Sequence, residues 1–430
     1  MKTKTAATTA LLASASVLMT LSTQAFAQTS VDALLNKLEQ KGILTVEEAK
    51  ALKAENAADA AADFNKSFTA KMGTADWINS YKFTGDFRGR WDDMSSDNTS
   101  VIDRERIRDR LRFGFVMNMK DDFEVGFKLG SGDGGALSNN QTFSGNGTKK
   151  GIYVDTAYAK WTAIKNDEWN VAATIGKTGQ QLDAQMLFDP DYTPEGAALL
   201  STYKLDKQNS LRFNAAIYVL DELAGSTRDP YLYAVQAFWD SKINANTSTS
   251  FGLSHYEISN QPSLTHAYNS NTGNTYVGGT YVNSYRPWVV DGSATFNQET
   301  FPIKIGVEYL DNSAVSTSDN KGWWAGFTLN KAGKKGTWDL AYRYQKLEAN
   351  AWWDQIVDDD NAAALPTSAT AAALHGGTNV KGHWVKFQYM VSDSLTFATT
   401  VYMADLINNP FPANSNVDGF HSMVDLLWKF

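Results

Sequence analysis

The chain contains no cysteine, so no disulfide framework can organise its fold. After the N-terminal leader, no segment approaches the roughly 18 consecutive apolar residues of a membrane helix, which excludes membrane insertion through helices. Only nine prolines are present, and no proline- or serine-rich linker interrupts residues 80–430. These absences indicate that the long C-terminal part is one domain held together by another kind of interaction.

Signatures of catalysis and of nucleic-acid binding are also missing. The five histidines lie in weak contexts, and no G-x-S-x-G, H-E-x-x-H or phosphate-loop motif occurs. The formal net charge of -8 disfavours nucleic acid as a partner. We therefore expect no enzyme, no cofactor and no metal site. The acidic run Asp358-Asp359-Asp360 is interpreted as a solvated loop, with a calcium site as the less favoured alternative.

The N-terminal residues divide into two segments. Residues 1–27 combine two lysines, a short apolar stretch and the ending Ala25-Phe26-Ala27, which is typical of a secretory signal peptide cleaved after Ala27. In residues 28–75, leucines at helical spacing and the T-x-x-E capping box of Thr45 and Glu48 predict a periplasmic helical segment. Its apolar stripe is too short to fold alone. The segment therefore either packs on a partner, as in a coiled coil between subunits, or is an amphipathic spacer.

From Lys82 onward the chain repeats one unit, a run of residues of alternating polarity followed by a break. About ten residues tilted by about 45° cross a hydrocarbon layer as a β-strand, and about sixteen such runs follow. Short polar links such as "NMKDD" and "VSDS" alternate with long ones near 93–107, 131–152, 177–198, 257–286 and 346–382. Outer-membrane barrels sort their links in this way, and soluble sandwiches have no reason to do so. Residues 76–430 are therefore predicted to be an all-β transmembrane domain, an antiparallel barrel whose outer face contacts lipid.

Three stretches carry a resemblance to a known family: the N-terminal "LLNKLEQKGILTVEEAKAL", the link containing "LFDPDYTPEGA", and the C-terminal Phe430. With them the chain resembles bacterial outer-membrane porins, in particular the putative-porin families, which are related in architecture to phosphate-selective and general trimeric porins. The resemblance implies passive transport of small hydrophilic solutes and ions across the outer membrane of a Gram-negative bacterium. It also implies a homotrimer and a role for Phe430 as the barrel-assembly signal.

A row of arginines at two-residue spacing lies in "DRERIRDRLRFGF", residues 103–115. On a strand these arginines share one face, and the opposite face carries Leu111, Phe113 and Phe115. Because Arg or Lys on the lipid side at mid-membrane costs about 2 to 4 kcal/mol, the basic face is expected to line the lumen. The predicted pore-lining basic residues are Arg88, Arg90, Arg104, Arg106, Arg108, Arg110, Arg112, Lys128, Lys160, Arg212 and Arg343. For Arg104 and Arg106, an ion-pair network at the mouth is the alternative.

The third long link carries four acidic residues, Asp183, Asp189, Asp191 and Glu195. In general porins, which the chain resembles, the corresponding loop folds into the barrel and its acids face an arginine cluster. The resemblance therefore implies an acidic constriction loop, and stabilisation of the loop's own backbone is the alternative role. Opposed charges across a narrow pore set up a transverse field. The predicted function is a diffusion porin with weak charge selectivity. The alternatives are an anion- or phosphate-selective channel and a secreted β-rich adhesin or binding protein.

Overall fold

The computed structural model describes residues 38, 45, 47–48, 76–98, 102–261, 264, 273–277, 280–315, 318–365, 377–409 and 418–430. The predicted signal peptide and most of the predicted helical segment lie outside the described residues. At the start of the second predicted helix, the Thr45 amide donates to a Glu48 carboxylate oxygen (2.8 Å), and the Glu48 amide donates to Thr45 Oγ1 (3.2 Å). These reciprocal hydrogen bonds confirm the capping box. Among the described residues, no helix is long and apolar enough to cross a membrane.

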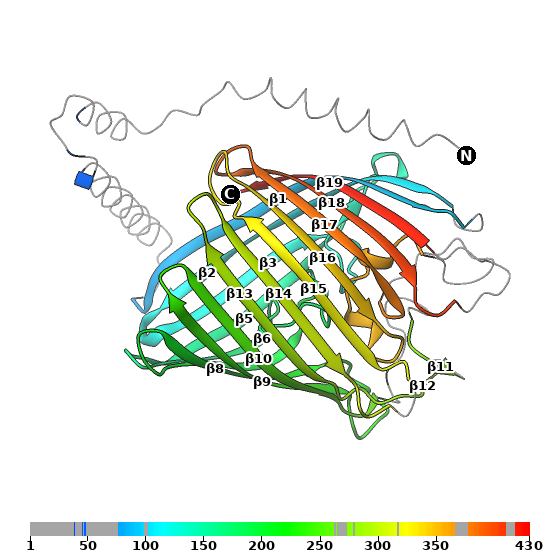
Figure 1. Ribbon diagram of the computed structural model, residues 1–430, viewed down its shortest axis with the longest axis horizontal. Coiled ribbons are helices and arrows are strands. Elements are labelled where there is room, and N and C mark those ends of the chain that lie inside the picture. Colours follow the sequence, from blue (N-terminus) through cyan, green and yellow to red (C-terminus); the bar gives the residue numbers. More distant parts are fainter. Residues whose placement is uncertain are drawn as a thin grey trace. The chain divides into compact units, whose positions relative to one another are not determined.

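Residues from Trp77 onward form a closed antiparallel β-barrel (Figure 1). Within the described part of the chain its wall has sixteen strands, as the sequence pattern predicts. They are β1 (Ile78–Ser96), β2 (Arg104–Met119), β3 (Phe123–Ser131), β5 (Ile152–Lys165), β6 (Trp169–Lys177), β7 (Glu195–Lys204), β8 (Asn209–Val219), β9 (Tyr231–Asn244), β10 (Thr247–Ile258), β13 (Trp288–Asn297), β14 (Pro302–Asp311), β15 (Lys321–Asn330), β16 (Trp338–Leu347), β17 (Val380–Met390), β18 (Leu395–Leu406) and β19 (Asp418–Lys429). Each strand pairs with its neighbours in this order.

The connections between the wall strands contain short strands and 3-10 turns. A two-residue strand, β4 (Gln141–Thr142), pairs with β2, and β11 (Tyr276–Val277) pairs with β12 (Thr280–Tyr281). The described 3-10 turns are η1 (Lys120–Asp122), η2 (Gly145–Gly147), η4 (Asp354–Ile356) and η5 (Asp360–Ala362). The last two belong to the long link between β16 and β17, and this link contributes to the interior of the barrel.

The barrel closes where its first strand meets its last. β1 and β19 pair from Asp86 opposite Lys429 to Ser96 opposite Gly419. Beyond β19, the Phe430 amide donates to the Gly85 carbonyl (3.1 Å) and the Gly85 amide donates to the Phe430 carbonyl (2.8 Å). A Cβ at Gly85 would lie 2.3 Å from the Phe430 ring, so the glycine leaves room for this terminal aromatic side chain. Closure removes the exposed strand edges that a bilayer could not solvate.

The connections alternate between a shorter class of two to seven residues and a longer class of seven residues or more. The short ones are 120–122, 166–168, 205–208, 245–246, 298–301, 331–337 and 391–394, and the long ones are 97–103, 132–151, 178–194, 220–230, 259–287, 312–320, 348–379 and 407–417. Because consecutive strands are antiparallel, the two classes lie at opposite ends of the barrel. This arrangement confirms the predicted sorting of the links.

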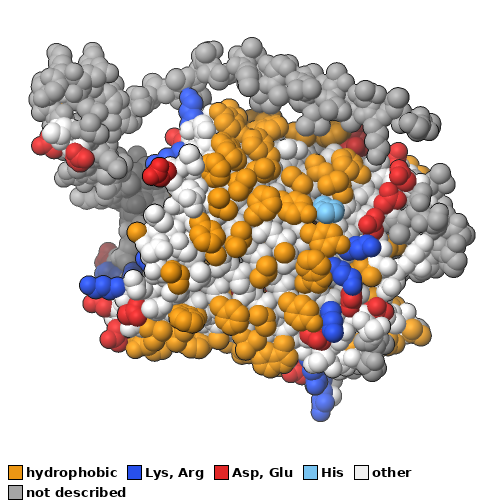
Figure 2. All heavy atoms as spheres, viewed as in Figure 1, with side chains coloured by type: hydrophobic (Ala, Val, Ile, Leu, Met, Phe, Trp, Pro, Cys, Tyr) orange, Lys and Arg blue, Asp and Glu red, His pale blue; other side chains and the backbone are white. Residues whose placement is uncertain are grey.

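The outer wall is apolar, and its aromatic side chains contact one another across strands (Figure 2). The rings of Phe83 and Phe115 lie 6.3 Å apart between centroids, and those of Phe115 and Phe127 lie 5.9 Å apart. Phe87 approaches Trp428 across the closing seam at 5.9 Å. The alternate residues of the same strands are polar and face inward, so the usual arrangement of a soluble protein is reversed.

This arrangement predicts how a charge affects stability on each face of the wall. Ile305→Lys places an ammonium group on the outer face in the middle of β14, whereas Ser293→Lys places it on the neighbouring strand β13, toward the interior cavity. We expect Ile305→Lys to lower the free energy of unfolding in lipid vesicles by about 2 to 4 kcal/mol, because the lipid side cannot solvate the charge. The Ser293→Lys variant is the control and is expected to fold nearly as stably as the wild type. Equal losses in urea titrations of the two variants would contradict the assigned faces.

Candidate channel and its constriction

The barrel encloses a polar cavity of about 1020 Å³. Nine basic and ten acidic side chains line it. They are Arg88, Arg90, Arg106, Arg108, Arg110, Arg212, Lys304, Arg343 and Lys386, and Asp183, Asp189, Asp191, Asp240, Asp291, Glu308, Asp358, Asp359, Asp360 and Asp425. The numbers of basic and acidic side chains are nearly equal, so the electrostatic potential in the cavity depends on where these side chains lie.

The arginines of β1 and β2 form a dense basic wall. Arg88 lies directly opposite Arg110 in the sheet, and Arg90 lies directly opposite Arg108. Like charges in directly opposed positions repel each other, so this wall needs compensating carboxylates. We call these four residues, together with Arg106, the arginine wall.

Carboxylates on the neighbouring strands and on an interior loop neutralise much of this charge. Arg90 binds Asp425 of β19 in a bidentate ion pair, with nitrogen–oxygen distances of 2.7 and 2.9 Å. Arg110 binds Asp86 of β1 at 2.8 Å and Asp191 of the loop 178–194 at 3.2 Å. The bidentate pair fixes the guanidinium of Arg90 and the carboxylate of Asp425 in one mutual orientation.

The part of the wall nearest the long loops is organised around Asp92, which is fully buried. Its carboxylate accepts hydrogen bonds from Arg106 at 2.6 Å and from Arg108 at 3.3 Å, and its second oxygen contacts His421 Nε2 at 2.7 Å. The other ring nitrogen of His421 contacts the Asp360 carbonyl oxygen at 2.9 Å. This network joins β1, β2 and β19 to the long link after β16.

Two cations on this side lack such compensation. Within the described residues, no carboxylate oxygen lies within 4.0 Å of Arg88 or Lys386. Arg88 instead donates to Asn140 Oδ1 (2.5 Å), and its Nε is buried without a hydrogen-bond partner. These two side chains therefore supply uncompensated positive charge to the cavity.

The loop 178–194 enters the barrel and crosses the cavity. Near its start, the Asp183 carboxylate binds Arg212 of β8, and near its end Asp191 binds Arg110 of the arginine wall. Between these contacts, the Gln185 and Met186 amides donate to the Glu308 carboxylate of β14 (3.0 and 3.2 Å). The loop is thus held at both walls.

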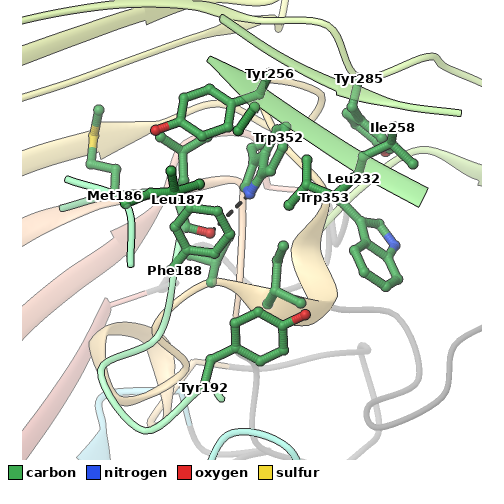
Figure 3. Packing of buried hydrophobic residues seen from close by; sticks show 14 of the residues in the cluster. Met186, Leu187, Phe188, Tyr192, Leu232, Tyr256, Ile258, Tyr285, Trp352 and Trp353 are labelled. Atoms are coloured by element: carbon green, nitrogen blue, oxygen red, sulfur yellow. Dashed lines mark hydrogen bonds between the residues drawn. The ribbon is translucent and has the colours of Figure 1, made fainter. Parts of the chain in front are cut away.

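A second loop, residues 348–365, also lies inside the barrel and packs on the first. Trp352 is fully buried and its Nε1 donates to the Leu187 carbonyl (2.9 Å, the dashed line in Figure 3). The Asp189 amide donates to the Ile356 carbonyl (2.8 Å). Phe188 makes edge contacts with Trp352 and with Tyr256 of β10 (Figure 3). Together with Tyr281, Tyr285, Leu232 and Leu310, these side chains form an apolar core inside the lumen.

The acidic run Asp358-Asp359-Asp360 belongs to this second loop, and its half-buried side chains line the cavity inside the barrel. Carboxylate oxygens of Asp189, Asp358 and Asp359 lie within 4.8 Å of one another. Burial, reinforced by the neighbouring carboxylates, raises the pKa of Asp189 well above its ordinary value. The same causes, with Asp360 as the first charged neighbour, raise the pKa of Asp358 to about 6 and that of Asp359 to about 8. The apolar packing of the loop explains why the run is inside.

The structure gathers seven of the predicted basic residues around the cavity: Arg88, Arg90, Arg106, Arg108, Arg110, Arg212 and Arg343. Of the remaining four, Arg104 is exposed at the end of β2, and Arg112 pairs with Asp86 at 2.9 Å beside the cavity. Lys128 lies 3.9 Å from Asp155, and Lys160 belongs to β5. Arg106 lines the cavity and also takes part in an ion-pair network, in which it shares the buried Asp92 with Arg108.

Of the predicted loop acids, three lie in the loop that enters the barrel and one does not. Asp183 and Asp191 face arginines, whereas Asp189 faces the second loop. Glu195 differs from the expectation because β7 begins there. Its side chain is exposed and pairs with Lys177 of β6 at 3.2 Å.

The sequence interpretation missed the second inward loop. A signal for it exists in "WWDQIV", residues 352–357, because a solvated outer loop seldom carries two tryptophans, an isoleucine and a valine together.

Comparisons with known proteins agree with this architecture. Residues 96–275 match the family model described as "Putative porin". Among solved structures, OprB of Pseudomonas putida is similar with a TM-score of 0.53 and 12% identity over 81% of this chain and 94% of that one. The chain folds as a bacterial porin. A variant of the Rh. blastica porin matches with a TM-score of 0.44 and 11% identity over 81% of this chain and all of that one. No curated protein matches the sequence.

The expectations that the protein is not an enzyme and that it needs no cofactor or metal stay predictions. The closed barrel with its apolar outer wall also disfavours the secreted adhesin.

The packing of the two loops predicts the effect of removing the central tryptophan. Trp352→Ala opens a cavity in the lumenal core and deletes the hydrogen bond to Leu187, at a cost of about 3 to 5 kcal/mol. We expect proteinase K to cleave both inward loops of this variant in detergent, while the barrel keeps its heat-modifiable migration in gels. Trp323→Ala on the outer wall is the matched control and is expected to keep the loops protected. Full protection of the Trp352→Ala loops would show that the core does not hold them.

Proposed function

We propose that this porin is a water-filled channel for the passive diffusion of small hydrophilic solutes and ions. The observation that carries the proposal is the polar cavity that the closed barrel encloses, which is lined by charged side chains of both signs. The arginine wall on β1 and β2 faces acidic residues on the loop 178–194 and on β13 and β14, among them Asp183, Asp291 and Glu308. β13 is the tenth wall strand counted from β1 around a ring of sixteen, so the two groups lie on nearly opposite sides.

This arrangement supports a transverse electric field across the constriction. Low-dielectric walls strengthen interactions between charges beyond their value in bulk water. A dipolar, hydrated solute gains favourable interactions with both walls, whereas an apolar solute gains none and loses the water that it displaces. The two inward loops narrow the path and keep solutes within reach of the charged side chains.

The near balance of basic and acidic side chains supports weak charge selectivity. The uncompensated Arg88 and Lys386 favour a mild preference for anions, because guanidinium and ammonium groups bind oxyanions. A channel selective for anions or phosphate is the second candidate, and the same two cations favour it. The ten acidic side chains along the cavity oppose it.

We further propose the assembly and the route to the membrane. Residues 1–27 direct secretion and are removed after Ala27, residues 28–75 form a periplasmic helical segment, and residues 76–430 insert as the barrel, with Phe430 as the assembly signal. Three copies form the working unit, in keeping with the trimeric porins that the chain resembles.

Recordings of the purified protein in planar bilayers test the channel directly. We expect stable ohmic steps that appear in multiples of three, and liposome swelling that slows as the test sugar becomes larger. A protein that folds into vesicles but never conducts would refute the channel.

Charge selectivity is tested with Arg88→Ala and Lys386→Ala under a salt gradient. Each change removes one uncompensated cation, so the reversal potential is expected to shift toward cation selectivity in both variants. Lys334→Ala, on a short turn away from the cavity, is the control and is expected to leave the potential unchanged. A strongly cation-selective wild type that neither cavity substitution alters would remove these cations from the mechanism.

A further inference from the structure

The seam between the two inward loops holds a set of carboxyl groups that the proposed transport does not need. Asp189 comes from the loop 178–194, and Asp358 and Asp359 come from the loop 348–365. The backbone hydrogen bond from the Asp189 amide to the Ile356 carbonyl places these groups together. Any force between them acts directly on the contact that holds the two loops to each other.

Nearby cations reach only some of the acidic groups of the seam. Among the described residues, Arg343 of β16 lies 4.0 Å from Asp358, and Arg90 of β1 lies 3.7 Å from Asp360. Arg110 of β2 lies 3.2 Å from Asp191. No basic nitrogen of the described residues lies within 4.0 Å of the carboxylate of Asp189 or Asp359.

The remaining charged and titratable groups around the seam do not change this imbalance. Arg108 of β2 and His421 of β19 face it, but both bind the buried Asp92. Tyr402 of β18 is buried beside the acidic run. Asp189 does accept one hydrogen bond, from the Asp191 amide at 2.6 Å. With every carboxyl ionised, the charges of Asp189 and Asp359 have no basic partner within 4.0 Å among the described residues.

We propose that this seam is a proton-controlled latch. Its protonated carboxyls keep the loops 178–194 and 348–365 packed together, which keeps the constriction narrow, and their ionisation weakens this packing. The proposal rests on the proposed channel function. The direction of the change follows from the geometry: like charges within 4.8 Å repel across the boundary between the loops, and protonation removes that repulsion.

The pH range follows from the raised pKa values. A carboxyl whose pKa is higher in the packed state than in the free loop stabilises the packing when it is protonated. This stabilisation is complete at acid pH and is lost as the pH rises through about 6 for Asp358 and about 8 for Asp359. The latch is therefore expected to hold near pH 5 and to be released near pH 9.

Conductance in planar bilayers provides the first test. In wild-type channels at fixed salt, the conductance or its fluctuations are expected to rise between pH 6 and pH 8. An asparagine at position 359 cannot ionise, so the Asp359→Asn variant is expected to lose the part of the rise near pH 8 and to keep the part near pH 6 that Asp358 causes. Glu222→Gln, an exposed acid in the mouth loop 220–230, is the control and is expected to follow the wild type. A flat wild-type profile, or an Asp359→Asn profile identical to that of the wild type, would overturn the latch.

A second readout separates loop movement from a purely electrostatic effect and does not require conduction. The chain has no cysteine, so I356C places a single thiol at a seam position that is 1% exposed. At pH 8.5, maleimide is expected to label I356C faster than the double variant I356C/D359N. A nearby carboxylate disfavours the reactive thiolate, so the charge of Asp359 alone would change the rates in the opposite direction. Equal rates would show that ionisation does not open the seam. A chain that never conducts but shows the rate difference would refute the channel and retain the latch.

Discussion

The absence of water from the bilayer core is the constraint on which the structure depends. Every backbone N–H and C=O group at membrane depth must find a partner within the protein, and a closed barrel achieves this with strands alone. Closure at β1 and β19, completed by the hydrogen bonds between Gly85 and Phe430, leaves no open edge among the wall strands. It also places apolar side chains outside and charged ones inside, which creates the lumen in which all further chemistry takes place.

The barrel wall alone would enclose a wide lumen lined by charged residues, and such a lumen would select poorly among solutes. Two loops narrow it by building an apolar core inside the barrel, around Trp352 and Phe188. This core fills the side of β9, β10 and β14 near the long loops and leaves the arginine wall free of apolar cover. Ion pairs with Arg212 and Arg110 hold the loop 178–194 to the barrel wall, and the apolar core holds the two loops to each other. Both kinds of contact therefore fix the position of the constriction.

Most of the wall was predictable from the sequence, because alternation, strand length and the parity of the links are local consequences of spanning a bilayer. The apolar face of Leu111, Phe113 and Phe115 and the inward arginines follow from the period of two. The position of the second inward loop was not predictable in this way. It depends on long-range packing of Trp352 on Leu187, and its acidic run reads locally as a solvated segment. Likewise, the partners of Arg90 and Arg106 depend on strand register across β19 and β1, which no local pattern specifies.

The central claim is that solutes pass along the arginine wall, while the opposite side of the mouth is filled by the loop core. Single cysteines in the cysteine-free chain test this most directly. Ser138 lines the cavity beside Arg108, whereas Ser254 of β10 points inward but is 1% exposed beneath the core. A bulky charged thiol reagent added to open channels is predicted to reduce the current of S138C and to leave that of S254C unchanged. Block of S254C without block of S138C would contradict the account.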